Sequence, residues 1–291
     1  MIAKYKCLNC IINHASKLFE KTEKTLDISQ EEIFNNYKKI ISYLIEKAVW
    51  GKKPIEISLP LYEKMEEVFG KNDYFENEKI KANNIFLNMY DELIFMCENS
   101  EDKIHSALKL SAVGNYIDFG INNAFGELEW EIENLLKTKE FYLNDIELFK
   151  KDLEVAKTLL FIHDNAGEIV LDKILIQVIK NIFPNIKVYS AVRSQPIIND
   201  ATLYDAESIK LNELSLVLES GSKYPGTLLS NVSGEFRNIF NEADVIISKG
   251  QGNYEGLVGT GKGIFFILMA KCDVVAESLN MKKGDIVLKK I

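Results

Sequence analysis

The sequence has few of the residues that mark secreted, membrane-spanning or metal-stapled proteins. It contains four cysteines and three histidines among 291 residues, too few for a disulfide scaffold and typical of a reducing compartment. The N-terminus lacks the long apolar core and cleavage site of a signal peptide. No apolar run approaches the ~18 residues of a transmembrane helix. We therefore expect a cytoplasmic protein with no membrane partner.

A basic footprint is also missing. The formal net charge is −8 and the isoelectric point is about 5.2, and no basic block interleaved with aromatic residues occurs. Nonspecific binding to nucleic acid depends on such a footprint, so we expect no nucleic-acid partner. Hydrophobic residues make up 47% of the chain, which is enough for the core of one large domain or two smaller ones.

Proline and alternating β-branched residues are scarce in the first half. Prolines occur there only at positions 54 and 60, and Ser29 with Glu32 forms a capping-box pattern that opens a helix. Apolar residues near helical spacing predict helices over 11–23, 31–50, 60–69, 79–97 and 103–119. We therefore predict a helical domain over residues 1–152.

The second half has a different texture. Strand-like apolar runs occur at 158–162, 186–192, 214–218, 244–248 and 264–268, and helix-like segments occur at 168–181, 205–211, 234–241 and 254–261. Strands that alternate with helices predict a mostly parallel sheet with helices on its faces. The expected fold class is α/β: a three-layer α/β/α, Rossmann-like sheet domain over residues 153–291 beside the N-terminal all-helical domain.

The segment after the first strand-like run is a candidate metal site. It reads HDNAGE over 163–168 and turns into a helix. In open α/β sheets ligands bind at the carboxyl ends of the strands, and oxygens such as those of Asp164 and Asn165 suit Mg²⁺ or Mn²⁺. Capping of the next helix explains the same residues, so the hexapeptide alone leaves both interpretations open.

The same chemistry recurs after the next predicted strand. Asn199 and Asp200 follow the run 186–192, so two oxygen-rich pairs would meet across one cleft. Three or four protein oxygens, with water and a substrate phosphate, suit Mg²⁺. An Asx-turn that caps the following helix is the alternative.

Two glycine-rich segments are candidates for holding phosphate. Residues 220–227, SGSKYPGT, form a loop whose backbone N–H groups can cradle an anion, but without the Gly-Lys-Ser/Thr ending of a Walker A loop they also fit a plain turn. Lys249 ends a buried run beside Gly250 and Gly252, which fits a charge aimed at phosphate. A lysine that extends to solvent is the alternative. Asn253 is a candidate for positioning substrate or metal.

Weaker features remain. Cys7 and Cys10 form an isolated CxxC; zinc normally needs two more ligands at matching spacing, so packing is the default interpretation and a redox or auxiliary metal role the alternative. His163 is expected to pack at a strand end or to support a neighbouring ligand. Asn115 lies in an apolar helical segment, which fits either contact with a polar cleft or surface exposure.

Taken in order, these motifs resemble those of one family. HDNAGEIVLD, RSQPIINDAT, SGSKYPGT, ADVIISKGQGNYE and FILMAKC are similar to motifs of the metal-dependent damage-control phosphatases, formerly the domain of unknown function 89 family. CLNC and AVGNYIDFG resemble its archaeal and bacterial subfamily with an N-terminal CxxC. The resemblance spans almost the whole chain, with little signal over residues 20–100.

The resemblance implies an α/β/α catalytic domain beside a helical domain. It also implies a divalent metal cofactor (Mn²⁺, Co²⁺, Ni²⁺ or Mg²⁺) and hydrolysis of small phosphorylated metabolites, such as sugar phosphates or damaged phosphometabolites. By motif match it places Asp164, Asn165 and Asp200 at the family's metal positions and Lys249 at its phosphate position.

We therefore expect a metal-dependent phosphatase in which Asp164, Asp200 and Lys249 carry the catalysis. The expected substrate contacts are Lys249, Gly250, Gly252, Asn253, Asn115 and Glu168. The sequence leaves open whether a water or an aspartate is the nucleophile. An S-adenosylmethionine-dependent carboxyl methyltransferase and a noncatalytic metal- or nucleotide-binding module are the alternatives.

Overall fold

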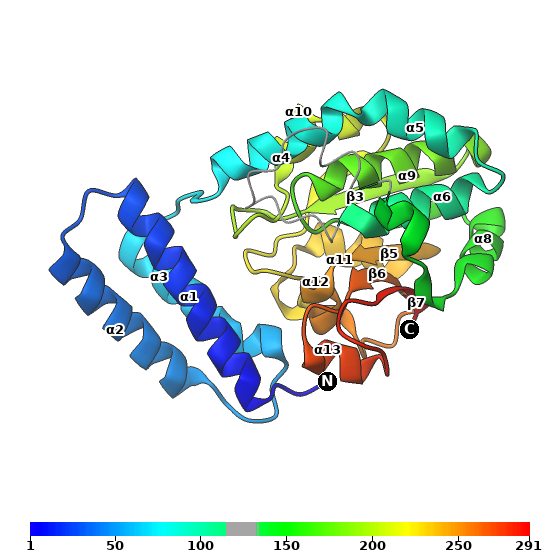
Figure 1. The fold of residues 1–291 in the computed structure, drawn as a ribbon. Coiled ribbons are helices and arrows are strands. Elements are labelled where there is room, and N and C mark those ends of the chain that lie inside the picture. The colour runs from blue at the N-terminus through cyan, green and yellow to red at the C-terminus, as the bar shows by residue number, and fades with distance from the viewer. Residues whose placement is uncertain (115–131, 133) are drawn as a thin grey trace.

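A seven-stranded sheet organises the residues described in this computed structural model, which are 1–114, 132 and 134–291 (Figure 1). The strand order is β1-β7-β6-β5-β2-β3-β4. The strands are β1 (Phe141–Asn144), β2 (Thr158–Ile162), β3 (Lys187–Val192), β4 (Leu216–Glu219), β5 (Val245–Lys249), β6 (Phe265–Met269) and β7 (Ile286–Lys290). Strands β6, β5, β2, β3 and β4 are parallel, whereas β7 is antiparallel to β6 and parallel to β1.

The order of the strands creates a switch point beside β2. From β2 the chain moves outward to β3 and β4, and then returns to β5 on the opposite side of β2. Ligands of open α/β sheets bind at such a point, outside the carboxyl ends of the strands. Asp164 follows β2 and Gly250 follows β5, so both lie at this edge.

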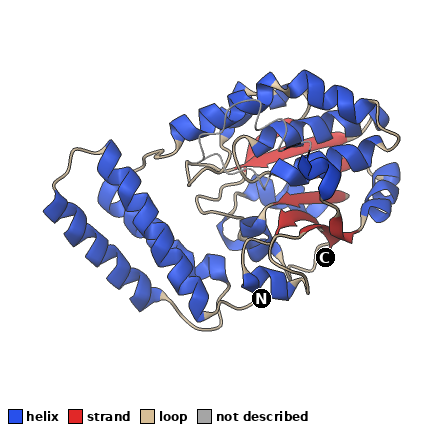
Figure 2. Cartoon of the chain, viewed as in Figure 1, coloured by secondary structure: helices blue, strands red, loops and turns tan. Residues whose placement is uncertain are grey.

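Helices cover both faces of the sheet (Figure 2). Alternation along β2 sends Leu159 and Phe161 to one core and Leu160 and Ile162 to the other. The first core includes residues of α4 (Glu76–Asn88), α5 (Tyr90–Glu98), α6 (Lys103–Val113), α8 (Ile146–Val155), α9 (Glu168–Ile182) and α10 (Leu203–Ser208). The second includes residues of α11 (Gly234–Glu242), α12 (Gln251–Leu257) and α13 (Asp273–Ser278).

The first three helices form a unit with a core of its own. They are α1 (Tyr5–Thr25), α2 (Gln30–Lys47) and α3 (Pro54–Phe69), and they extend to one side of the sheet (Figure 1). The Ser29 side chain accepts a hydrogen bond from the N–H of Glu32 at 3.2 Å, which confirms the predicted start of α2. Ile197, Tyr224 and Val274 from the sheet region pack into the same core, which joins the two parts.

The predicted α/β class is confirmed, and each of the five predicted strands is present within two residues of its expected bounds. Several local predictions were wrong, including the start of the first helix, which begins at Tyr5, and the end of α12 at Leu257. The segment 79–97 forms two helices that meet at Met89, α3 begins six residues before Pro60, and the sheet gains β1 and β7. A short strand at the edge of a sheet depends on its partner more than on its own pattern. The boundary at residue 152 stays a prediction, although β1 joins the sheet ahead of it. None of the described helices is long and apolar enough to cross a bilayer.

Candidate active site

Backbone hydrogen bonds join the loop after β2 to the loop after β3 at the switch point. The N–H of Ala201 donates to the carbonyl of Asp164 at 2.8 Å, and the N–H of Ala166 donates to the carbonyl of Asn199 at 2.9 Å. Asn165 and Asp200 face each other in an antiparallel bridge. The three residues predicted to hold a metal, Asp164, Asn165 and Asp200, therefore meet at one place.

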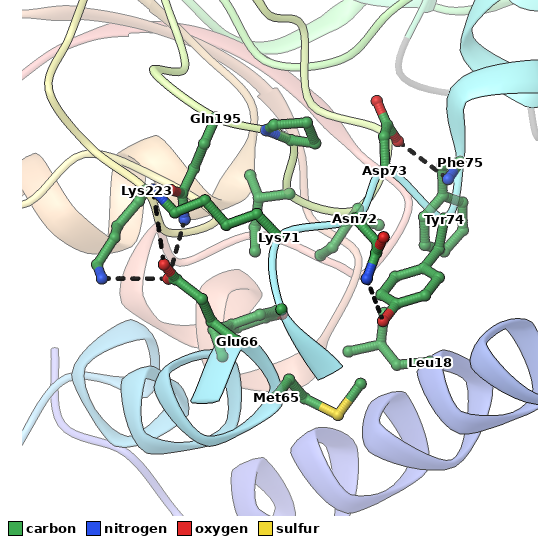
Figure 3. Close-up of a pocket in the computed structure, with 15 residues that line it drawn as sticks. Leu18, Met65, Glu66, Lys71, Asn72, Asp73, Tyr74, Phe75, Gln195 and Lys223 are labelled. Carbon is green, nitrogen blue, oxygen red and sulfur yellow. Dashed lines mark hydrogen bonds and ion pairs between the residues drawn. The ribbon is translucent and has the colours of Figure 1, made fainter. Parts of the chain in front are cut away.

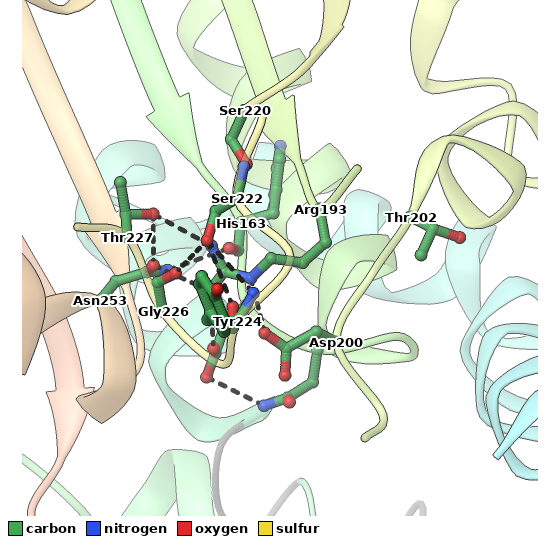
Figure 4. A network of polar contacts seen from close by, with 12 residues as sticks. His163, Arg193, Asp200, Thr202, Ser220, Ser222, Tyr224, Gly226, Thr227 and Asn253 are labelled. Atoms are coloured by element: carbon green, nitrogen blue, oxygen red, sulfur yellow. Dashed lines mark hydrogen bonds and ion pairs between the residues drawn. The ribbon is translucent and has the colours of Figure 1, made fainter. Parts of the chain in front are cut away.

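Arg193, at the end of β3, connects this place to two further segments (Figure 4). Its Nε donates to Oδ2 of Asp200 at 2.7 Å, and its Nη2 lies 4.0 Å from Oδ1 of Asp164. Its two Nη atoms also donate to Thr227 at 3.0 Å and to Asn253 at 2.9 Å. The Arg193 side chain is 2% exposed, so its guanidinium is an internal cation that orients one carboxylate and partly balances both.

The surroundings of Asp164 and Asp200 disfavour the ionised form of both carboxyl groups. Burial, followed by the neighbouring carboxylates of Asp200 and Glu168, raises the pKa of Asp164 well above its ordinary value. Burial also raises the pKa of Asp200, and Arg193 offsets only part of this effect. A divalent cation would stabilise the ionised form of both groups.

The donor chemistry fits a hard divalent ion. Asn165 uses its Nδ2 to donate to Asp164 at 3.0 Å and to Glu168 at 3.2 Å, and neither contact uses its Oδ1. The available set is therefore two carboxylates and one amide oxygen, which suits Mg²⁺ or Mn²⁺. Among the described residues, no three His, Cys, Asp or Glu side chains are arranged to share an ion.

Lys249 lies in a buried ionic cluster behind the carboxylates. Its Nζ pairs with Oε1 of Glu168 at 2.8 Å and with Asp172, and donates to Oγ of Ser111 at 2.7 Å and to the Ser111 carbonyl at 2.9 Å. Burial alone would lower the pKa of this amine, but Asp172 and Glu168 outweigh it and raise the pKa. Asp172 also lies 3.0 Å from Nδ1 of His163. A direct contact of Lys249 with phosphate stays a prediction.

The other predicted substrate residues have different surroundings. Gly250 abuts the Asp164 carboxylate, and Gly252 packs against the carbonyl of Pro225. Asn253 is fully buried and uses its whole amide: Nδ2 donates to the carbonyls of His163 and Lys249, and Oδ1 accepts from Arg193 and Thr227. It therefore braces the ends of three strands. Asn115 lies outside the described residues.

Helix α4 supports the site from the helical part of the chain. Asn83 accepts a hydrogen bond from the N–H of Gly167 at 2.7 Å and donates to Asp205 at 3.0 Å. The buried Lys79 pairs with the same Asp205 at 3.2 Å and with Asp73 at 2.7 Å. These contacts hold the turn that carries Asp164 against a helix more than 80 residues away in sequence.

Helix α3 holds two more loops of the sheet edge (Figure 3). Its Glu66 pairs with Nζ of Lys223 at 3.2 Å and accepts from Gln195 at 3.4 Å. The adjoining cavity has a volume of about 70 Å³, room for a few water molecules but not for a phosphorylated metabolite.

Arg193 is a residue of the candidate site that our sequence analysis did not select. It stands in the quoted motif before Asn199 and Asp200, and the sequence holds only one other arginine, Arg237. The sequence signal that could have identified Arg193 was a rare arginine close to the predicted carboxylates. Cys7 and Cys10 are free thiols, and the described residues offer them no metal-binding set.

A mostly parallel sheet with the carboxylates of Asp164 and Asp200 at its switch point is typical of the class of ligand-binding α/β proteins. The chain belongs to the damage-control phosphatase family, because the model of the damage-control phosphatase ARMT1-like domain matches residues 3–287. Membership in the subfamily marked by CxxC stays a prediction.

Archaeal relatives match along most of the chain. A damage-control phosphatase of Pyrococcus horikoshii is 35% identical over 99% of this chain and 97% of its own length. An uncharacterized protein of Methanocaldococcus jannaschii is 34% identical over 99% of this chain and 95% of its own length. The crystal structure of a DUF89 family protein from Pyrococcus horikoshii has a TM-score of 0.90, with 33% identity, 100% coverage of this chain and 99% of that one.

Proposed function

We propose that this protein is a metal-dependent phosphatase that hydrolyses phosphate monoesters of small metabolites. The observation that carries the proposal is the convergence of Asp164, Asn165 and Asp200 at the switch point, where burial and mutual repulsion create a demand for a cation. Family membership supports the phosphatase class. The metal, the residues that hold it and the substrate are parts of the proposal.

The residues of the chain have distinct tasks in this proposal. Asp164, Asp200 and the Asn165 amide oxygen would hold the divalent ion, which when bound polarises a phosphoryl oxygen and lowers the pKa of a water. Arg193 fixes the orientation of Asp200 through the 2.7 Å contact. Glu168 holds the Nδ2 side of Asn165, which leaves the amide oxygen for the ion.

Lys249 has a positioning task in the proposed site. Because its amine is engaged by Ser111, Glu168 and Asp172, it holds the two acidic side chains of α9 together and offsets part of their negative charge. Backbone N–H groups near Gly250 and Gly252 remain our candidates for contacts with the transferring phosphoryl group.

The direct test is hydrolysis of a generic phosphate monoester by the purified full chain with Mn²⁺, Co²⁺, Ni²⁺ or Mg²⁺, and with a chelator. We expect turnover that the chelator abolishes and that Asp164→Ala lowers by about a thousandfold, as for loss of a principal transition-state contact. Asp27→Ala, a loop carboxylate exposed between α1 and α2, is the matched control. Undiminished activity in Asp164→Ala would overturn the assignment.

The same protein allows the nucleophile to be determined. Rapid acid quenching with a labelled phosphate ester traps an acid-stable aspartyl-phosphate if a carboxylate attacks, and leaves no label on the protein if water attacks. The methyltransferase alternative predicts metal-independent binding of S-adenosylmethionine in calorimetry, and the noncatalytic alternative predicts metal binding without turnover. Cytoplasmic location and the absence of a nucleic-acid partner stay predictions.

A further inference from the structure

A cavity of about 480 Å³ lies between the three-helix unit and the sheet edge. Its lining comes from α1 and α3 on one side, and from the 198 loop, the Pro225 loop, α12 and the start of α13 on the other. Its volume is in the range of sites that enclose a small organic ligand. Several quoted motifs contribute to its lining, among them Cys7 and Cys10 of CLNC and Pro225 of SGSKYPGT.

The cavity adjoins the carboxylate cluster. Ile198 lines it and stands two residues before Asp200, while Gln251 and Gly252 line it directly after the glycine that touches Asp164. Tyr62, another lining residue, lies close enough for Asp200 to raise its pKa, after the larger effect of burial. A phosphate held at Asp164 and Asp200 would therefore direct the rest of the ester into this space.

The walls of the cavity are largely apolar. The apolar residues include Ile11, Pro54, Ile55, Ile198, Pro225 and Val274, and the charged residues include Lys6, Glu255 and Asp273. Exposed lysines such as Lys271 and Lys283 belong to its lining as well. Such walls favour burial of hydrocarbon, at roughly 25 cal/mol for each Å² removed from water.

Most polar side chains in the lining already have partners within the protein. Ser58 donates to the Ile55 carbonyl at 2.8 Å. Gln251 donates to Glu255 at 3.0 Å and accepts from the N–H of Lys271 at 3.0 Å. Hydroxyl groups placed here would lose water without gaining equivalent hydrogen bonds, which is costly. His14 is one exception, because its Nε2 is buried without a hydrogen-bond partner, and the lining also includes the Tyr62 hydroxyl and the exposed Lys271 and Lys283 amines.

We propose that this cavity binds the organic part of the phosphate ester, and that it selects esters of alkyl or cyclic hydrocarbon alcohols over fully hydroxylated sugar phosphates. The unpartnered His14 Nε2 allows for one polar group in the bound alcohol. The proposal rests on the phosphatase function proposed above, and it assigns the substrate class of that same site.

A matched pair of substrates tests the selection. Cyclohexylmethyl phosphate has the ring size and primary leaving group of glucose 6-phosphate without its hydroxyl groups. We expect kcat/KM of the full chain with Mn²⁺ to be at least about tenfold higher for the cyclohexyl ester, the scale on which apolar pockets discriminate. Equal values, or a preference for the sugar phosphate, would overturn the proposal.

A pair of variants on α1 tests whether the preference for the cyclohexyl ester arises in this cavity. Cys10→Phe places a ring at the cavity lining, whereas Asn13→Phe adds the same ring to an exposed position of the helix that does not line the cavity. We expect Cys10→Phe to raise KM for the cyclohexyl ester by about tenfold with kcat little changed, and Asn13→Phe to leave both constants unchanged. Equal effects of the two variants would contradict the assignment.

A binding measurement separates this proposal from the phosphatase function. Anilinonaphthalene sulfonate is an apolar anion whose fluorescence increases when it binds an apolar site. It is titrated into the metal-free wild-type protein and into both variants. We expect binding to wild type and Asn13→Phe, with affinity reduced at least about fivefold in Cys10→Phe. If this pattern is observed but no ester is hydrolysed, the proposed phosphatase function is wrong, whereas the assignment of an apolar binding site to the cavity is retained. If turnover occurs but the probe binds all three proteins equally, the cavity assignment fails.

Discussion

Gly250 and Asp164 are in contact across the switch point: a β-carbon added to Gly250 would lie 1.8 Å from Oδ2 of Asp164. The glycine also has φ of +79°, a conformation that side chains rarely adopt. Because it carries no side chain, the loop after β5 closes directly on the carboxylate. The close approach links the positions of the two loops.

We expect Gly250→Ala to lower phosphatase activity by more than about tenfold and to lower the free energy of unfolding by about 1–3 kcal/mol. The added methyl group must displace Asp164 or the loop. Gly261→Ala is the control, since Gly261 has the same φ of +79° with no atom within 4 Å of the added carbon. Urea unfolding and initial rates of both variants give the comparison. Equal losses in the two would show that backbone strain alone is responsible.

We expect Arg193→Met to lower the free energy of unfolding far more than Arg237→Met, the same substitution at the surface. The substitution leaves Asp200 without its closest cation. It also removes the hydrogen bonds that Arg193 donates to Thr227 and Asn253. Breaking a buried pair in this way costs about 3–5 kcal/mol. Urea unfolding of Arg193→Met and of Arg237→Met, whose guanidinium is exposed and donates to the Leu229 carbonyl, measures the difference. A loss below that of Arg237→Met would refute the role given to Arg193.

Lys249→Met tests whether this amine stabilises the buried cluster or contacts phosphate. Loss of the cation leaves Glu168 and Asp172 buried together, and we expect a cost of about 3–5 kcal/mol. Adding Asp172→Asn should recover part of that stability, because it removes one of the two neighbouring buried carboxylates. The inhibition constant of inorganic phosphate should be unchanged in the double variant. A rise in that constant of about tenfold or more, without recovery of stability, would favour direct contact with phosphate.

Glu255 should make the stability of the protein fall as pH rises through the neutral range. Burial raises its pKa from 4.5 to about 7, so the folded state holds this proton more tightly than the unfolded state. The resulting stability is fully present below pH 4.5 and is lost as pH rises to about 7, a change of about 3 kcal/mol. Glu255→Gln should therefore gain free energy of unfolding relative to wild type between pH 5 and 8. Parallel pH profiles of the two proteins would contradict this.

The sequence was sufficient for the central strands and for the polar residues that follow them. β2 and β5 are short apolar runs buried on both faces, and their length and composition are distinctive. Oxygen-bearing residues in the loops after such runs lie at the carboxyl edge of a parallel sheet, so Asp164 after β2 and Asp200 in the loop after β3 were predictable as candidates. β1 and β7 at one end of the sheet were not, because the pairing that creates them is non-local.

By itself the amino-acid sequence determined the α/β class, the positions of five strands and the residues available for a metal site, because periodicity and strand ends are local properties. Only the tertiary structure decided which charges would face each other. It placed Arg193 between Asp164 and Asp200, directed Lys249 toward Asp172 and Glu168, and left a cavity between α1 and α12. These outcomes depend on strand order and helix packing, which bring together side chains far apart in the chain.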